Sequence, residues 1–343
     1  MVSELSTVVV FALGGTIASA SDSGGGAQVR LSGADLVAAI PQAGKVARIE
    51  AHSVTMVPSG DLSIGDLIRL RSLIEQALAG GAAGVVVSQG TDTLEETSYA
   101  LDLICGTDAP IVCTGAMRNA SLPGADGPAN LLAAIRVAAS PAARGLGVLV
   151  AFGDEIHAAR FVRKRHATSP GTFGSPLAGP VGYVIEDRVV ILLRPAGRLL
   201  VAVPDDAPDA PVAIVLTHLG DDGGLVSAVP SLGYAGMVLA ALGAGHVPSR
   251  IVPALESAAR QIPVVLASRT GAGDVLTGTY GFAGSESDLL RRGLIPAAGL
   301  DPAHAAVLLR LLLMAGIERD RLAYFFGQAC RADGPITATS PGS

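Results

Sequence analysis

The stretch SQGTDTLEET, residues Ser88–Thr97, decides the fold of this chain. It follows the apolar run Val85–Val87, which is typical of a buried strand, and it opens an amphipathic segment that predicts a helix over 93–104. A hydroxyl and a carboxylate, those of Thr91 and Asp92, therefore lie at a strand-to-helix turn. Because open α/β sheets place their ligands at such turns, the stretch predicts both the fold class and a site.

A second turn of the same kind lies near the start of the chain, where Gly14, Gly15 and Thr16 follow an apolar run. The glycines let the backbone bend closely around a ligand and present its amide N–H groups. A threonine is a weak nucleophile that needs a base and donors for the oxyanion, so two threonines on two such turns suggest acyl transfer. Lys164 is a candidate base. Taken singly, both threonines also fit helix N-caps and Lys164 fits an ordinary surface lysine.

Short β-branched runs alternate with helical patterns through the first half of the chain. Ser63 predicts an N-cap, and Thr93 with Glu96 has the spacing of a capping box. This rhythm predicts a parallel sheet with helices on both faces, whose polar turns gather at one edge. The predicted strands are 7–12, 85–88, 111–114 and 147–152, and the predicted helices are 63–79, 93–104 and 127–139.

The second half repeats the alternation after residues 195–211, whose four prolines and three aspartates predict a linker. The fold class is therefore α/β with two domains, each an open, mostly parallel sheet flanked by helices. The larger N-terminal domain is expected over 1–194 and a smaller, flavodoxin-like C-terminal domain over 212–343. The elements expected there are strands 212–217, 236–240 and 262–267 and helices 225–232, 249–260 and 302–315.

The composition excludes several classes of protein. Hydrophobic residues make up 50% and charged residues 16%, which argues against disorder, and a net charge of −6 without a long basic tract argues against nucleic-acid binding. The histidine and cysteine spacings predict no metal site, and no cofactor motif is present. The start of the chain lacks a basic segment before its apolar run, and apolar stretches stay shorter than the ~18 residues of a membrane span. We therefore expect a cytoplasmic protein without a membrane partner.

Two longer motifs resemble those of a known family. FALGGTIA, residues Phe11–Ala18, resembles the N-terminal signature of bacterial-type L-asparaginases, and QGTDTLEET, residues Gln89–Thr97, resembles their second signature. The similarity spans roughly residues 7–330. Further segments in the order of that family are Ser59–Asp61, Gly115–Arg118, the segment 125–130 and Lys164.

The resemblance implies hydrolysis of L-asparagine to L-aspartate and ammonia through a threonine acyl-enzyme, without a cofactor. Thr16 would be the nucleophile, and Thr91 and Lys164, with Asp92 nearby, would handle the protons. Ser59 would hold the α-carboxylate of the substrate, Asp92 its α-ammonium group, and Thr91 and Ala116 would line the amide end. The expected binding set also includes Gly15, Gly60, Asp61 and Gly90.

The resemblance also implies an oligomer. In that family two subunits pair so that the C-terminal domain of a neighbour completes each site, usually within a dimer of dimers. We therefore expect a homodimer or homotetramer.

The chain departs from the family pattern at several positions. Residues 19–35 contain no tyrosine, although family members commonly carry one there to activate the nucleophile. Tyr280 or a group from another subunit would substitute, or Thr16 would rely on Thr91 and Lys164 alone. The glycines 24–26 in this segment predict a flexible lid.

Gly60 stands where many members have Gln or Glu, and losing that contact to the substrate amino group would cost about 1–2 kcal/mol. The sequence then predicts weaker substrate binding, or a replacement carboxylate from the neighbouring subunit, for which Asp274, Glu286 and Asp288 are candidates. Gln89 replaces a frequent His, with its side chain expected to point away from the site.

Three alternatives remain open at this point. A glutaminase-asparaginase differs by one methylene of substrate, which an apolar pocket discriminates by only ~1–3 kcal/mol. The amidase component of a tRNA-dependent amidotransferase shares the fold but would need a partner subunit. A non-catalytic protein that binds an amino acid or nucleotide would use the glycine turn for anion binding.

Overall fold

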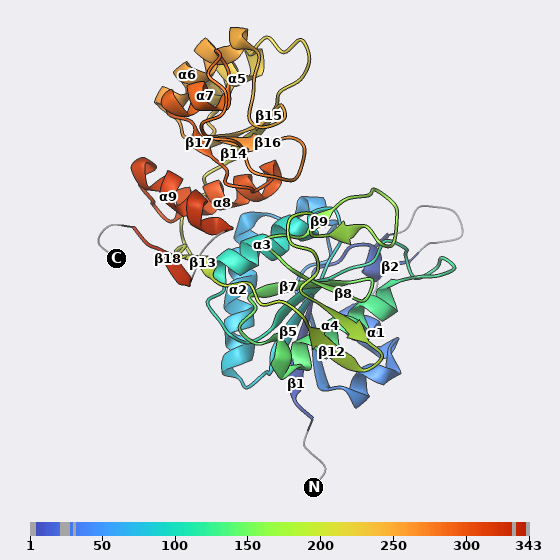
Figure 1. Cartoon of the computed structure of the whole chain (residues 1–343). Helices are drawn as coiled ribbons and strands as arrows, with labels where there is room; N and C mark the ends of the chain where they lie inside the picture. The colour runs from blue at the N-terminus through green and yellow to red at the C-terminus, as the bar shows by residue number, and fades with distance from the viewer. Residues whose placement is uncertain (1–4, 21–27, 30–31, 331–333, 341–343) are drawn as a thin grey trace. The chain divides into compact units, whose positions relative to one another are not determined.

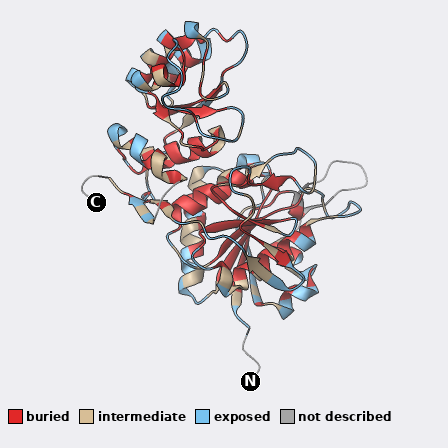
Figure 2. Ribbon diagram, viewed as in Figure 1, coloured by how far each residue is buried: buried red, intermediate tan, exposed pale blue. Residues whose placement is uncertain are grey.

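The computed structural model describes residues 5–20, 28–29, 32–330 and 334–340. The chain divides into two compact units, residues 1–195 and 196–343 (Figure 1). Each unit has its own buried layer of sheet residues between helices (Figure 2). The glycines 24–26, predicted to form a lid, lie outside the described residues.

The first unit is built on an eight-stranded sheet, which confirms the predicted α/β class. Its strand order is β12-β11-β8-β7-β6-β5-β1-β4, and the five strands from β7 to β4 are parallel. Those five are β4 (Arg48–Ser53), β1 (Thr7–Ala12), β5 (Gly84–Ser88), β6 (Ile111–Thr114) and β7 (Val148–Phe152).

Three strands that the sequence did not predict run antiparallel to their neighbours and complete the sheet. They are β8 (Glu155–Ala158), β11 (Gly182–Ile185) and β12 (Arg188–Ile191). A separate two-stranded pair joins β9 (Arg163–Lys164) to β10 (Phe173–Gly174), and β2 (Ser19–Ala20) pairs with β3 (Gln28–Val29).

Helices cover both faces of this sheet. α1 (Gly33–Ala38) and α4 (Gly127–Ala139) pack on the face that carries Val8 and Val10. α2 (Ile64–Ala79) and α3 (Leu94–Ile104) pack against each other and against β5 and β7. Burying these apolar side chains supplies the main driving force for the fold.

The order of the parallel strands creates a switch point. The chain passes from β1 to β4 on one side of β1 and then returns to β5 on its other side. Connections therefore leave β1 and β5 toward opposite sides, and a crevice opens between their carboxyl ends, where ligands bind in open α/β sheets.

The predicted caps of α2 and α3 differ in outcome. Ser63 Oγ accepts a hydrogen bond from Asp66 N, and a carboxylate oxygen of Asp66 accepts one from Ser63 N. The N-cap predicted at Ser63 is therefore confirmed, and the structure shows it to be part of a capping box. Thr93 makes no capping bond, and the capping box predicted with Glu96 is wrong. The Thr93 hydroxyl instead donates to the carbonyl oxygen of Ser59 at 2.9 Å, a tertiary partner that local spacing does not reveal.

The second unit holds a four-stranded parallel sheet in the order β14-β15-β16-β17. The strands are β14 (Val212–Leu216), β15 (Gly236–Ala241), β16 (Val264–Ser268) and β17 (Ile295–Pro296). The helices are α5 (Gly224–Ala228), α6 (Val252–Gln261), α7 (Glu286–Arg291), α8 (Pro302–Met314) and α9 (Arg319–Ala329).

The segment 195–211 is not wholly a linker. Its residues Arg198–Val201 form β13, which pairs in parallel with β18 (Pro335–Ala338). Leu199 and Val201 are buried by this pairing. The partner strand lies more than a hundred residues further along the chain, so the proline-rich composition hid it. Among the described residues no helix is long and apolar enough to cross a membrane.

Candidate active site

The glycine turn after β1 lies directly against the turn after β5. Gly15 has φ +84°, and a Cβ atom on it would lie 2.0 Å from the backbone nitrogen of Gly90. Gly14 has φ +106°, and a Cβ there would lie 2.6 Å from Val57 O. Only glycine combines this backbone conformation with so close an approach, so these positions bring the two signatures together at the switch point.

The segment Ser59–Asp61, a 3₁₀ turn, joins them as a third element. Ser59 is buried, and a Cβ on Gly90 would lie 2.8 Å from its Oγ. The bond from Thr93 to Ser59 O ties this segment to the start of α3. Gly60 and Asp61 lie on the same turn and are exposed.

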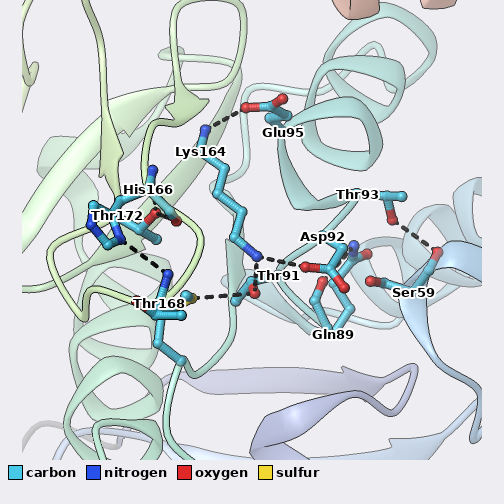
Figure 3. A network of polar contacts seen from close by, with 12 residues as sticks. Ser59, Gln89, Thr91, Asp92, Thr93, Glu95, Lys164, His166, Thr168 and Thr172 are labelled. Atoms are coloured by element: carbon cyan, nitrogen blue, oxygen red, sulfur yellow. Dashed lines mark hydrogen bonds and ion pairs between the residues drawn. The ribbon is translucent and has the colours of Figure 1, made fainter.

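Lys164 reaches this crevice from β9, outside the main sheet. Its Nζ donates to Thr91 Oγ1 at 2.9 Å and to Asp92 Oδ1 at 2.6 Å (Figure 3). The Lys164 side chain is 14% exposed and that of Asp92 is 82% exposed, so the ammonium group is mostly enclosed while the carboxylate faces solvent. An open cavity of about 400 Å³ is lined by Asp92, Lys164, Arg165, His166 and Ala167.

Thr91 is therefore a buried hydroxyl with an ammonium group as its neighbour. It accepts a hydrogen bond from Lys164 and turns its own hydrogen toward Met117 Sδ at 3.3 Å. A hydroxyl between a lysine and a reacting group can pass a proton from one to the other, which is the function of a base in nucleophilic catalysis.

The loop after β6 lines the crevice from a fourth side. A Cβ on Gly115 would lie 2.6 Å from Gln89 O, and Ala116 is buried. Asp126 accepts from Met117 N at 3.0 Å and Arg118 N at 2.8 Å. This carboxylate therefore fixes the loop that carries Ala116.

Asn130, buried on α4, links two of these turns. It donates to Gly115 O at 3.1 Å and accepts from Gly153 N at 3.0 Å. In the sequence, the segment 125–130 is recognisable only from the order of segments in the family. Its function as a tie between two loops depends on backbone partners that spacing does not identify.

The structure thus gathers most of the predicted site residues at one edge of the sheet. Those described around the crevice are Gly15, Ser59, Gly90, Thr91, Asp92, Ala116 and Lys164. The backbone of Thr16 begins a 3₁₀ turn directly after Gly15, and its side chain lies outside the described part of the structure. Gln89 is fully buried and its amide donates to Gly90 O at 3.2 Å.

The acidic candidates of the second unit differ in accessibility. Glu286 is fully buried and accepts from Thr279 N at 2.9 Å and Tyr280 N at 2.7 Å. Burial alone would raise the pKa of this carboxyl, but the backbone donors outweigh it and lower the pKa below its usual value. Asp288 accepts from Gly284 N at 3.0 Å. Both carboxylates are buried and accept backbone hydrogen bonds of their own chain. The side chain of Asp274 is exposed.

These observations define a class of protein: a two-domain α/β protein with a hydroxyl–lysine site at the switch point of its larger sheet. Models of two families match the chain, "Asparaginase, N-terminal" over residues 7–196 and "Glutaminase/Asparaginase C-terminal domain" over 211–326. A probable L-asparaginase of Deinococcus radiodurans is 38% identical, over 82% of this chain and 86% of that protein. A probable periplasmic L-asparaginase of Haemophilus influenzae is 34% identical, over 90% and 89%.

A solved structure agrees with these sequence matches. The crystal structure of a probable cytoplasmic L-asparaginase from Campylobacter jejuni superposes with a TM-score of 0.83 at 31% identity, covering 94% of this chain and 99% of that one. The chain belongs to the bacterial-type L-asparaginase family.

Proposed function

We propose that this protein is an amidohydrolase that converts L-asparagine to L-aspartate and ammonia through an acyl-enzyme on Thr16. Membership of the asparaginase family supports the reaction. The observation that carries the mechanism is the pair of hydrogen bonds from Lys164 Nζ to Thr91 and Asp92, beside the Gly15 turn from which Thr16 follows.

The chemistry divides into two steps. The Thr16 hydroxyl oxygen attacks the side-chain amide carbon while its proton passes to the Thr91–Lys164 relay. The relay returns a proton to the amide nitrogen, so that the carbon–nitrogen bond breaks and ammonia leaves. Water then attacks the resulting ester, and L-aspartate leaves as the Thr16 hydroxyl is restored. Backbone N–H groups of the glycine turn are suited to the oxyanion that forms in each step, because they need no reorganisation.

Substrate binding follows from the groups around the crevice. Asp92 would hold the α-ammonium group, which fits its exposed carboxylate, and Ser59 would hold the α-carboxylate. Thr91 and Ala116 would line the amide end, with Gly15 and Gly90 as the close backbone walls. Gly60 and Asp61 would lie at the rim of the crevice, which is compatible with their exposure.

The assembly and location of the protein belong to the same proposal. A homodimer or homotetramer would let a neighbour's C-terminal domain close the site, and Asp274 is the most exposed of its three acidic candidates. Tyr280 is 45% exposed and is available to replace the missing tyrosine. The Campylobacter protein, described as probably cytoplasmic, supports a cytoplasmic location, while the Haemophilus relative is described as periplasmic.

The decisive experiment measures ammonia release from L-asparagine and L-glutamine by the purified protein and by its Thr16→Ala and Thr91→Ala variants. We expect asparagine turnover in the parent and a loss of at least ~10³-fold in kcat for Thr16→Ala. Thr107→Ala serves as a matched control, because Thr107 lies before β6, away from the carboxyl edge of the sheet.

Each outcome separates the competing functions. Comparable turnover of both amides would identify a relaxed glutaminase-asparaginase. No turnover of either amide, combined with a rise in melting temperature on adding asparagine or aspartate, would contradict the enzyme and indicate a binding protein.

A further inference from the structure

Glu95 carries a buried carboxylate beside the site to which the mechanism above gives no function. It lies in the first turn of α3 and is only 9% exposed, although glutamate is rarely buried without a partner. Its Oε2 accepts the backbone N–H of Lys164, across 69 residues of chain (Figure 3). A hydrogen bond to an ionised acceptor is stronger than a neutral one, so this contact can fix the lysine backbone firmly.

Both ends of Lys164 are consequently bound to one short segment. The side-chain Nζ binds Thr91 and Asp92, while the backbone N–H binds Glu95, four residues after Thr91. The backbone and the side chain of Lys164 are thus both hydrogen-bonded to the segment at the start of α3. A lysine side chain has four flexible bonds, and anchoring its backbone removes much of the freedom that would carry Nζ away from Thr91.

The strand that carries Lys164 is short and lies apart from the main sheet. β9 has two residues and, within the described part of the chain, forms a two-stranded sheet with the two residues of β10. Within that hairpin Arg165 N binds Thr172 O at 2.8 Å and His166 N binds Thr172 Oγ1 at 3.0 Å. These bonds shape the hairpin itself, whereas the Glu95 bond connects it to α3. The position of the carboxylate in the first turn of a helix also suits its negative charge.

We propose that Glu95 is a positioning residue that holds Lys164 Nζ within hydrogen-bond distance of Thr91 Oγ1. It acts through the lysine backbone and does not touch the substrate. The inference rests on the proposed function for its kinetic consequence, because Lys164 and Thr91 are there assigned to the proton relay.

The same helix supplies a matched control. Asp102, in the last turn of α3, is 6% exposed, and its Oδ1 accepts the backbone N–H of Val148 at 2.8 Å. It is therefore another buried carboxylate that binds a backbone donor distant in sequence, but at the opposite end of the helix from the site. Loss of either carboxylate weakens packing, while only loss of Glu95 should displace Lys164.

The test compares Glu95→Ala and Glu95→Gln with Asp102→Ala and Asp102→Asn. We expect Glu95→Ala to lower kcat for asparagine by ~10-fold or more with little change in KM, since small displacements of a catalytic group carry such costs. Glu95→Gln keeps an acceptor oxygen and should recover most of this loss. Asp102→Ala should lower the melting temperature without a comparable change in kcat. Equal kcat losses for the two alanine variants would overturn the inference even if the parent is an asparaginase.

A second measurement does not depend on turnover. The amine of Lys164 is labelled with acetic anhydride, and the rate at that residue is followed by mass spectrometry. Loss of Glu95 should free Nζ from Thr91 and Asp92 and raise the labelling rate several-fold in Glu95→Ala but not in Asp102→Ala. An unchanged rate in Glu95→Ala would refute the positioning function, whether or not the protein hydrolyses asparagine.

Discussion

Gly60 is an exposed residue of the Ser59–Asp61 turn, and a Cβ placed on it would have no described atom within 4 Å. A Cβ atom can therefore be added there without a clash. We expect Gly60→Gln to lower KM for asparagine by roughly fivefold to thirtyfold, because an amide oxygen near the substrate ammonium adds a hydrogen bond worth about 1–2 kcal/mol. Initial-rate kinetics on the purified variant would measure this change.

A variant with an apolar side chain isolates the cause of that change. Gly60→Leu adds similar bulk without an acceptor and should leave KM unchanged or raise it. Gly15→Ala should lose activity, because its Cβ would overlap Gly90 N in a backbone conformation that disfavours side chains. A KM that falls equally for Gly60→Leu and Gly60→Gln would show that the gain does not come from the amide.

At the residue scale, sequence reasoning found the side chains that face the crevice and missed those that hold them. Thr91 and Asp92 are recognisable because a hydroxyl and a carboxylate follow a strand end in a motif that resembles a known signature, and Lys164 is recognisable from the order of segments in that family. Glu95 and Asp126 lie within the same quoted motifs, but their partners are backbone N–H groups of Lys164, Met117 and Arg118. Such partners depend on the folded path of the chain and not on residue type.

At the element scale, the residues that precede α2 and α3 have different hydrogen-bond partners, so their substitutions should have different effects. Ser63 caps α2, whereas Thr93 binds Ser59 O and does not cap α3. We expect Ser63→Ala to lower the free energy of unfolding by about 1 kcal/mol with unchanged KM, because a lost cap acts on the helix alone. Thr93→Val should instead raise KM by roughly fivefold, because the Ser59 turn loses a bond worth about 1 kcal/mol.

Urea unfolding and asparagine kinetics on the two variants together test this assignment. Thr107→Val is a suitable control for the loss of a threonine hydroxyl, since that hydroxyl binds Ala109 N near the amino end of β6. A Thr93→Val variant with reduced stability and an unaltered KM would mean that the hydroxyl supports the fold and not the binding site.

Helices and strands with a long, regular pattern of apolar residues were predicted best. The long helices α2, α3 and α4 and the buried strands β1, β5, β6 and β7 were predicted within a residue or two of their observed bounds. The edge strand β4, whose side chains are mostly exposed, was missed. The strands β8, β11 and β12 were also missed, because four residues show at most two periods of apolar–polar alternation. Their antiparallel pairing also follows no helical crossover that a βαβ rhythm would reveal.

At the scale of the whole molecule, topology explains why motifs far apart in sequence form one site. The strand order reverses at β1 and β5, which leaves a crevice at their carboxyl ends, and the glycine turns of both strands meet there. The sequence predicted the gathering of the turns at one edge from the parallel rhythm alone. It did not predict which neighbouring strands create the crevice, because strand order depends on pairing that no local pattern determines.

We expect one buried histidine to make the folded molecule less stable at acid pH. His157 on β8 is 1% exposed, and its Nδ1 lies 3.0 Å from Ser175 Oγ. Burial lowers the pKa of His157 from 6.5 to about 4, and the positive charge of Arg165 adds to the shift. Glu155 Oε2 lies 3.2 Å from Nε2, but that side chain is 40% exposed, so solvent screens its opposing effect.

The sign of the pH dependence follows from proton binding. Between pH 6.5 and 4 the unfolded chain protonates this histidine while the folded chain does not, so lowering the pH favours unfolding throughout that window. Above pH 6.5 this loss of stability vanishes, and below pH 4 it no longer grows, with a total contribution of about 3 kcal/mol.

We expect the free energy of unfolding of the parent to fall more steeply between pH 6.5 and 4 than that of His157→Gln, which keeps a polar group but cannot titrate. Urea unfolding at a series of pH values would measure both slopes, with His218→Gln as an exposed control, and parallel slopes for parent and His157→Gln would show that the acid sensitivity arises elsewhere.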